Sequence, residues 1–189
     1  MRRNTGPPGS LGRGRRQTKW RSRVVTRLPI GLRLALYQPD IAQNAGTLLR
    51  TCACLGVGAD LIEPAGFPTS DRHFRRAGLD YLDAVDLRRH RSFSAFEAWR
   101  TETPGRRLIL LTTRAETDYL DFSYNSDDVL MVGRESAGVP DAVRAAADAA
   151  VGIVLVPGLR SLNVAVAAAM VLGEALRQAR ARERRGAAQ

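Results

Sequence analysis

Short apolar runs alternate with segments of helical character along the chain, and this alternation constrains the fold more than any other feature. Residues 108–112 are apolar almost without interruption, as strands buried on both faces of a parallel sheet are. Strands are expected at 32–37, 59–62, 84–87, 108–112, 129–132 and 152–156, and helices at 42–55, 92–100, 140–150 and 161–183. Strands that alternate with helices predict an α/β domain with a mainly parallel sheet.

The positive charge of the chain is concentrated at its start. The net charge is +10 at pH 7, and nine of the Lys and Arg residues precede residue 30, where no acidic residue occurs. Residues 1–29 are rich in Gly, Pro and Arg and are expected to be a disordered basic extension, which is either an arm that binds nucleic acid or merely a solvated segment. The folded domain is expected to span residues 30–183, followed by a flexible tail at 184–189.

The cysteines and histidines do not form a metal-binding pattern. Cys52 and Cys54 are separated by one residue, which differs from the C-x-x-C spacing of redox and zinc sites, and His73 and His90 are the only histidines. We therefore expect no metal and two free thiols, which fits a protein of the reducing cytoplasm. No apolar run approaches the ~18–20 residues that span a bilayer, so no membrane association is expected.

Polar residues follow three of the predicted strands, at 112–113, 133–140 and 157–163. Ligands of parallel α/β sheets bind beyond the carboxyl ends of strands, so these stretches are candidates for a binding site. In the second stretch Gly133 and Gly138 flank Glu135. The glycines do not form the G-x-G-x-x-G pattern, and the P-loop lysine is absent. A structural turn with a solvated Glu135 is the simpler interpretation of this stretch alone.

Ser161 and Asn163 lie where the last predicted helix begins. Ser is among the best N-caps, and the apolar residues that follow are typical of a core helix, so capping by Ser161 is one interpretation. The other is a polar pair that faces a ligand from a rigid helix start.

Asn44 and Arg50 belong to the first predicted helix, on which a spacing of six residues places them roughly 120° apart. Asn44 could cap this helix. Arg50 lies in an apolar stretch, where a guanidinium needs an anionic or carbonyl partner.

Residues 44–50 (NAGTLLR), 133–140 (GRESAGVP) and 161–165 (SLNVA) resemble the three ordered motifs of the SPOUT RNA methyltransferases. The resemblance covers about residues 32–180. Residues 62–67 (IEPAGF) and 75–81 (RRAGLDY) resemble, more narrowly, the small tRNA 2′-O-methyltransferases that modify the wobble nucleotide, a cytidine or carboxymethylaminomethyluridine at position 34.

The resemblance implies a deep trefoil knot in the C-terminal part of the sheet, a homodimer in which two chains complete each site, and S-adenosylmethionine (SAM) as cofactor with tRNA as partner. Carried over by motif, the SAM-contacting residues are Leu111, Gly133, Ile153 and Ser161, and the catalytic or RNA-side residues are Asn44, Arg50, Glu135, Ser161 and Asn163. The family gives the arginine a part in activating the 2′-hydroxyl. Because a guanidinium stays protonated, we expect Arg50 to hold the adjacent phosphate, whose oxygen takes the proton.

Two alternatives remain at this point. The first is another SPOUT 2′-O-methyltransferase that acts on ribosomal RNA or on a different tRNA position. The second is a non-catalytic RNA-binding protein on the same scaffold. An aromatic content of 6% gives few platforms for stacking single-stranded RNA, and the presence of every motif side chain also disfavours a non-catalytic role.

Overall fold

The computed structural model describes residues 31–68, 72, 74, 76, 81 and 83–186. The expected extension 1–29, His73 and most of the 75–81 motif lie outside this part of the chain. In the part that is described, the strands are β1 (Arg33–Tyr37), β2 (Gly58–Ile62), β3 (Leu87–His90), β4 (Leu108–Leu111), β5 (Val129–Val132) and β6 (Ala149–Val151), and the helices are α1 (Ala42–Leu55), α3 (Phe93–Thr101), α4 (Asp141–Ala145) and α5 (Val164–Gly186).

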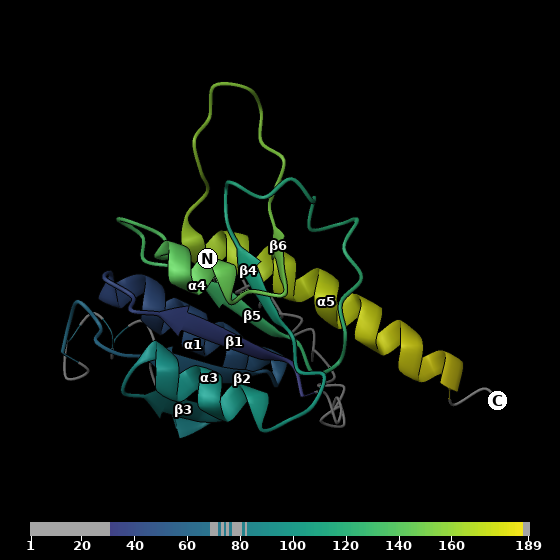
Figure 1. The fold of residues 1–189 in the computed structure, drawn as a ribbon, viewed down its shortest axis with the longest axis horizontal. Coiled ribbons are helices and arrows are strands. Elements are labelled where there is room, and N and C mark those ends of the chain that lie inside the picture. The colour runs from purple at the N-terminus through teal and green to yellow at the C-terminus, as the bar shows by residue number, and fades with distance from the viewer. Residues whose placement is uncertain are drawn as a thin grey trace, which may run out of the picture.

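The six strands form one sheet in the order β3-β2-β1-β5-β4-β6, and every pair is parallel (Figure 1). The prediction of a parallel α/β sheet is therefore confirmed. β1 has β2 on one side and β5 on the other, so the chain leaves β1 toward one edge and later returns to its opposite side. Ligands of such sheets bind in the crevice where the strand order switches in this way, here between the segments that follow β1 and β5.

Helices cover both faces of the sheet, because both faces are apolar. Along β1 the side chains alternate: Leu34 and Leu36 pack with α1 and α5 in one core, whereas Ala35 and Tyr37 pack with α3 and α4 in the other. Figure 1 shows the resulting three layers, with α1 and α5 together on one side. The long helix α5 extends to Gly186, three residues beyond its expected end.

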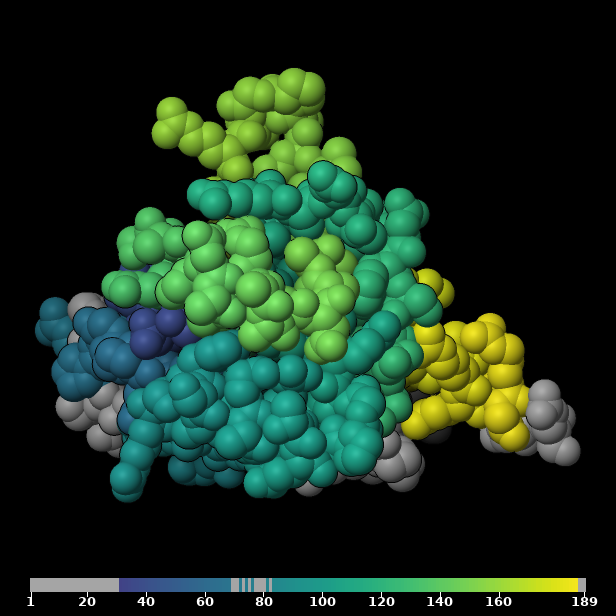
Figure 2. All heavy atoms as spheres, viewed as in Figure 1, coloured from purple at the N-terminus to yellow at the C-terminus, as the bar shows by residue number. Residues whose placement is uncertain are grey.

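The prediction of the last strand at 152–156 is wrong. β6 pairs with β4 only as far as Val151 opposite Leu111, where β4 ends. The backbone of Gly152 instead bonds to Thr117 and Tyr119. Val154 and Val156 beyond it are exposed on a segment that leads to α5 and projects from the body of the molecule (Figures 1 and 2).

Two further boundaries differ from those expected. The strand predicted at 84–87 is shifted to Leu87–His90, in register with β2. The helix predicted over 140–150 ends at Ala145, because Asp148 accepts a hydrogen bond from the Leu108 backbone N–H (2.7 Å) and thereby aligns the next residues beside β4.

Candidate active site

A cavity of about 530 Å³ lies at the carboxyl ends of β4 and β5 and at the start of α5. The loops that follow β5 and β6 contribute most of its wall. All but one of the residues predicted for the site line this cavity: Asn44, Leu111, Gly133, Glu135, Ile153, Ser161 and Asn163. The exception is Arg50.

The loop after β5 is closed by its own backbone. Arg134 and Gly138 exchange hydrogen bonds of 2.9 and 2.8 Å, and Gly138 has a φ of 66°. A Cβ atom on Gly133 would lie 2.6 Å from the carbonyl carbon of Gly138, so only glycine allows this approach. The closed loop presents Glu135 at its tip.

Glu135, Asn44 and Asn163 form a chain of hydrogen bonds that joins three separate segments. Asn44 donates from Nδ2 to Glu135 Oε1 (3.1 Å), and Asn163 donates from Nδ2 to Asn44 Oδ1 (3.0 Å). Each bond crosses more than 90 residues of sequence. Each amide nitrogen also carries a second hydrogen, so the chain can offer N–H donors to a ligand.

The capping interpretations are corrected by this geometry. Asn163, and not Ser161, caps α5, because its Oδ1 accepts from the backbone N–H of Ala165 (2.8 Å) and of Val166 (3.4 Å). Asn44 does not cap α1, whose N-cap residue is Ile41. Asn44 lies within the first turn, and its side chain is used by the hydrogen-bonded chain.

Asp40 belongs to the same cluster and was missed as a site residue. Its carboxylate accepts hydrogen bonds from the backbone N–H of Glu135 (2.9 Å) and of Ser136 (3.4 Å). Its own backbone N–H donates to Glu135 Oε2 (3.1 Å). The available signal was its place directly after β1, at the carboxyl edge of the sheet.

The two carboxyls of the cluster shift each other's titration in opposite directions. Burial, and then the side chain of Asp40, raises the pKa of Glu135. The Glu135 side chain, followed by hydrogen bonds from Ser136, lowers the pKa of Asp40. A positive charge is present at Arg134, whose Nε lies 3.7 Å from Asp40 Oδ2. The cluster therefore keeps Glu135 easier to protonate than an ordinary glutamate.

The rest of the cavity combines apolar walls with polar groups. Leu111, Ile153 and Leu155 supply apolar surface, whereas Arg160 and Ser161 supply donors from the segment before α5. Leu155 and Arg160 were not predicted as site residues. Such a lining fits a ligand with a flat apolar part and charged or hydroxyl-bearing parts.

Arg50 lies apart from the other predicted residues. It is exposed, and its guanidinium carbon is 4.9 Å from the centroid of the Tyr81 ring. It lines a separate depression between α1 and α5, together with Ala169 and Gly173. The partner that the structure shows for Arg50 is thus an aromatic ring, not the expected anion or carbonyl.

Over the residues that the structure describes, no group of three metal-ligating side chains occurs, and none of the helices is both long and apolar enough to cross a membrane. Both cysteines are free thiols. Cys52 is packed in the core, where burial raises its pKa to about 12, whereas Cys54 is exposed.

Comparison with known proteins agrees with these motifs. The tRNA (cytidine(34)-2′-O)-methyltransferase of Beijerinckia indica subsp. indica is 72% identical over 145 residues, which cover 77% of this chain and 90% of that protein. A solved structure that concerns the 2-OH methylation of C/U34 on tRNA is 42% identical, with a TM-score of 0.73, and the match covers 78% of this chain and 95% of that one.

An AdoMet-bound rRNA methyltransferase from Sinorhizobium meliloti is 26% identical with a TM-score of 0.71, and the match covers 77% of this chain and 56% of that one. Residues 31–173 match the SpoU rRNA methylase family, and this match includes all three motifs and the residues that line the cavity. The resemblance inferred from the three motifs is thereby confirmed, and the chain belongs to the SpoU methylase family.

Proposed function

We propose that this protein transfers a methyl group from SAM to the ribose 2′-hydroxyl of the wobble nucleotide, position 34, of tRNA. The observation that carries the proposal is the chain Glu135–Asn44–Asn163, which meets at the cavity although its members come from three distant motifs. The relatives named for methylation of cytidine 34 support this choice of substrate over ribosomal RNA.

The cavity suits SAM in size and chemistry. Its volume of about 530 Å³ lies in the range of cofactor sites. We propose that Leu111 and Ile153 flank the adenine, that the backbone at Gly133 approaches it closely, and that Ser161 contacts the polar part of the cofactor. When bound, SAM supplies an electrophilic methyl group on its sulfonium.

The side chains of the protein then orient the acceptor. In methyl transfer the 2′-oxygen would form a bond to the methyl carbon, the carbon–sulfur bond would break with its electron pair left on sulfur, and the hydroxyl proton would pass to an oxygen of the adjacent phosphate held by Arg50. We propose that the free N–H groups of Asn44 and Asn163 hold oxygen atoms of the ribose, while the Glu135 carboxylate fixes the Asn44 amide, which in turn holds Asn163. Much of the rate would come from this positioning of two reactants.

Arg50 fits this mechanism if two copies of the chain complete each site. In its own chain it faces the depression beside α5 and not the cavity. The same side of α5 exposes apolar side chains, with Val166 51% and Met170 37% exposed, next to the small residues Ala169 and Gly173. We propose a homodimer packed on this face, in which Arg50 of one copy holds the RNA phosphate next to the cavity of the other.

Mixed dimers test this arrangement. Arg50→Ala and Glu135→Gln protomers are each expected to lose most of their activity alone. After mixed refolding or co-expression, random pairing should restore about a quarter of the wild-type activity, because each mixed dimer keeps one intact site. If mass spectrometry shows mixed dimers but no activity is recovered, Arg50 and Glu135 of the same chain act in one site.

The activity itself is tested with methyl-labelled SAM, total tRNA and ribosomal RNA, followed by mapping of the labelled nucleotide. We expect label only in tRNA, on the ribose of nucleotide 34. Label in ribosomal RNA or at another tRNA position would replace the proposed substrate, and RNA binding without label would support a non-catalytic role.

We further propose that the chain adopts the trefoil knot of the SPOUT fold, since the loop 133–140 and the segment 157–163, which form the knot in that class, meet at one cavity here. A tRNA substrate and two free thiols also support a cytoplasmic location.

A further inference from the structure

Asp40 links two segments that are 95 residues apart. Its carboxylate accepts hydrogen bonds from the backbone N–H groups of Glu135 and Ser136 and from the Ser136 hydroxyl, and its own N–H donates to the Glu135 carboxylate. The Asp40 side chain is only 17% exposed. It does not line the cavity, so it acts on the site only through the residues that it holds.

The bonds to Asp40 fix the tip of the loop after β5, which the loop's own backbone bonds do not hold. The pair Arg134–Gly138 closes the base of the loop through its backbone, but the two N–H groups at the tip point away from this pair and toward Asp40. With the tip fixed, the Glu135 side chain receives one bond from the Asp40 backbone on Oε2 and one from Asn44 on Oε1. Because each oxygen has its own donor, the carboxylate has little freedom to rotate.

We propose that Asp40 is a positioning residue for methyl transfer: it fixes the tip of the loop 133–138, and thereby the Glu135 carboxylate that orients Asn44 and Asn163. This inference rests on the proposed function for its catalytic consequence. Because the base of the loop is closed by its own backbone bonds, the wall at Gly133 and Gly138 persists without Asp40. Loss of Asp40 therefore lowers turnover far more than cofactor affinity.

The test compares Asp40→Ala with Asp141→Ala in the full-length protein. Asp141 carries the same charge just beyond the same loop, but its side chain is fully exposed and lies 3.9 Å from Nε of Arg144, one helical turn away. We expect Asp40→Ala to lower kcat on tRNA by at least about 10-fold, because positioning is lost. The Kd for SAM, measured by calorimetry, should stay within about threefold. Asp141→Ala should match the wild type in both.

Two further measurements distinguish positioning from misfolding and from failure of the proposed function. Hydrogen exchange of the Glu135 and Ser136 amides needs no substrate and should be faster in Asp40→Ala than in Asp141→Ala. Asp40→Asn, which keeps one acceptor oxygen for the Glu135 N–H, should recover part of kcat. The inference is overturned if kcat is unchanged in Asp40→Ala, if kcat and SAM affinity fall by the same factor, or if the exchange of these amides is unchanged.

Discussion

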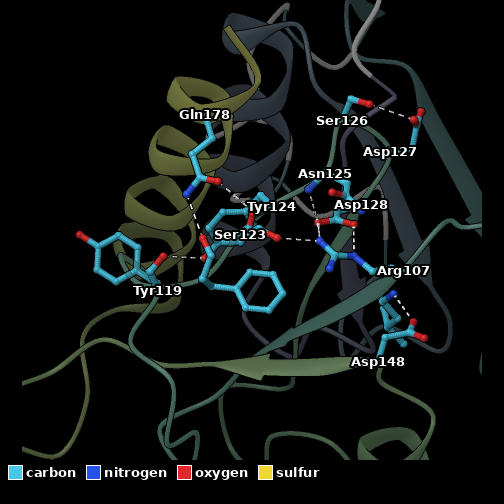
Figure 3. A network of polar contacts seen from close by, with 12 residues as sticks. Arg107, Tyr119, Ser123, Tyr124, Asn125, Ser126, Asp127, Asp128, Asp148 and Gln178 are labelled. Carbon is cyan, nitrogen blue, oxygen red and sulfur yellow. Dashed lines mark hydrogen bonds and ion pairs between the residues drawn. The ribbon is translucent and has the colours of Figure 1, made fainter. Parts of the chain in front are cut away.

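Acidic side chains lie at both edges of the sheet, but they are paired with a cation at one edge and mainly with neutral donors at the other. At the amino-terminal edge, just before β5, Asp128 is fully buried and is bonded by Arg107 through Nε (2.9 Å) and a terminal nitrogen (2.7 Å), and by the backbone N–H of Asn125 (2.8 Å) (Figure 3). Hydrogen bonds to the backbone also connect this region to α5, where the Gln178 side chain accepts from the Tyr124 N–H and donates to the Phe122 carbonyl.

At the carboxyl-terminal edge, Asp40 and Glu135 face each other beside the cavity. Their partners are mainly backbone N–H groups and the Asn44 amide, and the guanidinium of Arg134 is 3.7 Å from Asp40. The Asp128 carboxylate is occupied by its donors, and removing one partner of such a buried pair is strongly destabilising. At the carboxyl-terminal edge the anion of Glu135 is disfavoured, and groups whose pKa is shifted in this way gather at functional sites. Asp128 at the amino-terminal edge thus serves the stability of the fold, whereas Asp40 and Glu135 at the carboxyl-terminal edge serve the site.

Removal of Asp128 should have the largest effect on stability. Asp128→Ala leaves the partly buried Arg107 without its carboxylate, so we expect a loss of about 3 kcal/mol in the free energy of unfolding. Urea denaturation measures this loss, with Asp127→Ala as the control, because the neighbouring Asp127 is exposed. An equal loss in both variants would remove the distinction between the edges.

Asn163 has both a capping and a site role, and two substitutions separate them. Asn163→Ala removes the cap of α5 and should cost about 1 kcal/mol of stability. Asn163→Asp keeps the capping oxygen but loses the N–H group that donates to Asn44 Oδ1. This variant should therefore keep its stability, while its rate of methyl transfer falls at least about 10-fold. Thermal unfolding and a tRNA methylation assay give the two readouts, and a fully active Asn163→Asp would remove the side chain from the mechanism.

The smallest expected effect is a pH dependence of stability. The pKa of Glu135 is raised in the folded protein, so the folded state holds this proton more tightly than the unfolded chain does. Above the usual pKa of about 4.3, stability is therefore lost as the pH rises, until Glu135 is ionised in both states. Glu135→Gln removes this penalty.

Urea denaturation of wild type and Glu135→Gln from about pH 5 to about pH 8 measures the effect. The stability of the variant relative to the wild type should rise with pH over this window. A difference that is constant, or that changes in the opposite direction, would show that Glu135 is not held as an unfavourable carboxylate.

Local sequence patterns were enough for much of the fold. The helix at 42–55 and the strand at 129–132 have the predicted bounds, because a glycine ends each and their apolar patterns are strong. The last strand was misplaced, since Val154 and Val156 read as a buried strand but are 78% and 69% exposed. Apolarity does not reveal that β4, the only available neighbour, has already ended.

The candidate site shows the same limit. Motif resemblance led to Glu135 and Asn163, but the bond between Asn163 and Asn44 and the contacts of Asp40 span 95 to 119 residues. A single sequence contains no local signal for such pairs. The position of Arg50 outside the cavity follows the expected 120° rotation along α1, but in the proposed dimer the surface that it meets belongs to a second copy of the chain.

The most direct test of the division between the edges is the single-turnover rate of methyl transfer to tRNA at saturating SAM, compared between Glu135→Gln and Asp128→Asn at a temperature where both are folded. We expect Glu135→Gln to be slowed at least about 10-fold with unreduced stability, and Asp128→Asn to react within about twofold of the wild type despite a lower melting temperature. A full rate for Glu135→Gln, or an equal loss of rate in both variants, would contradict the account.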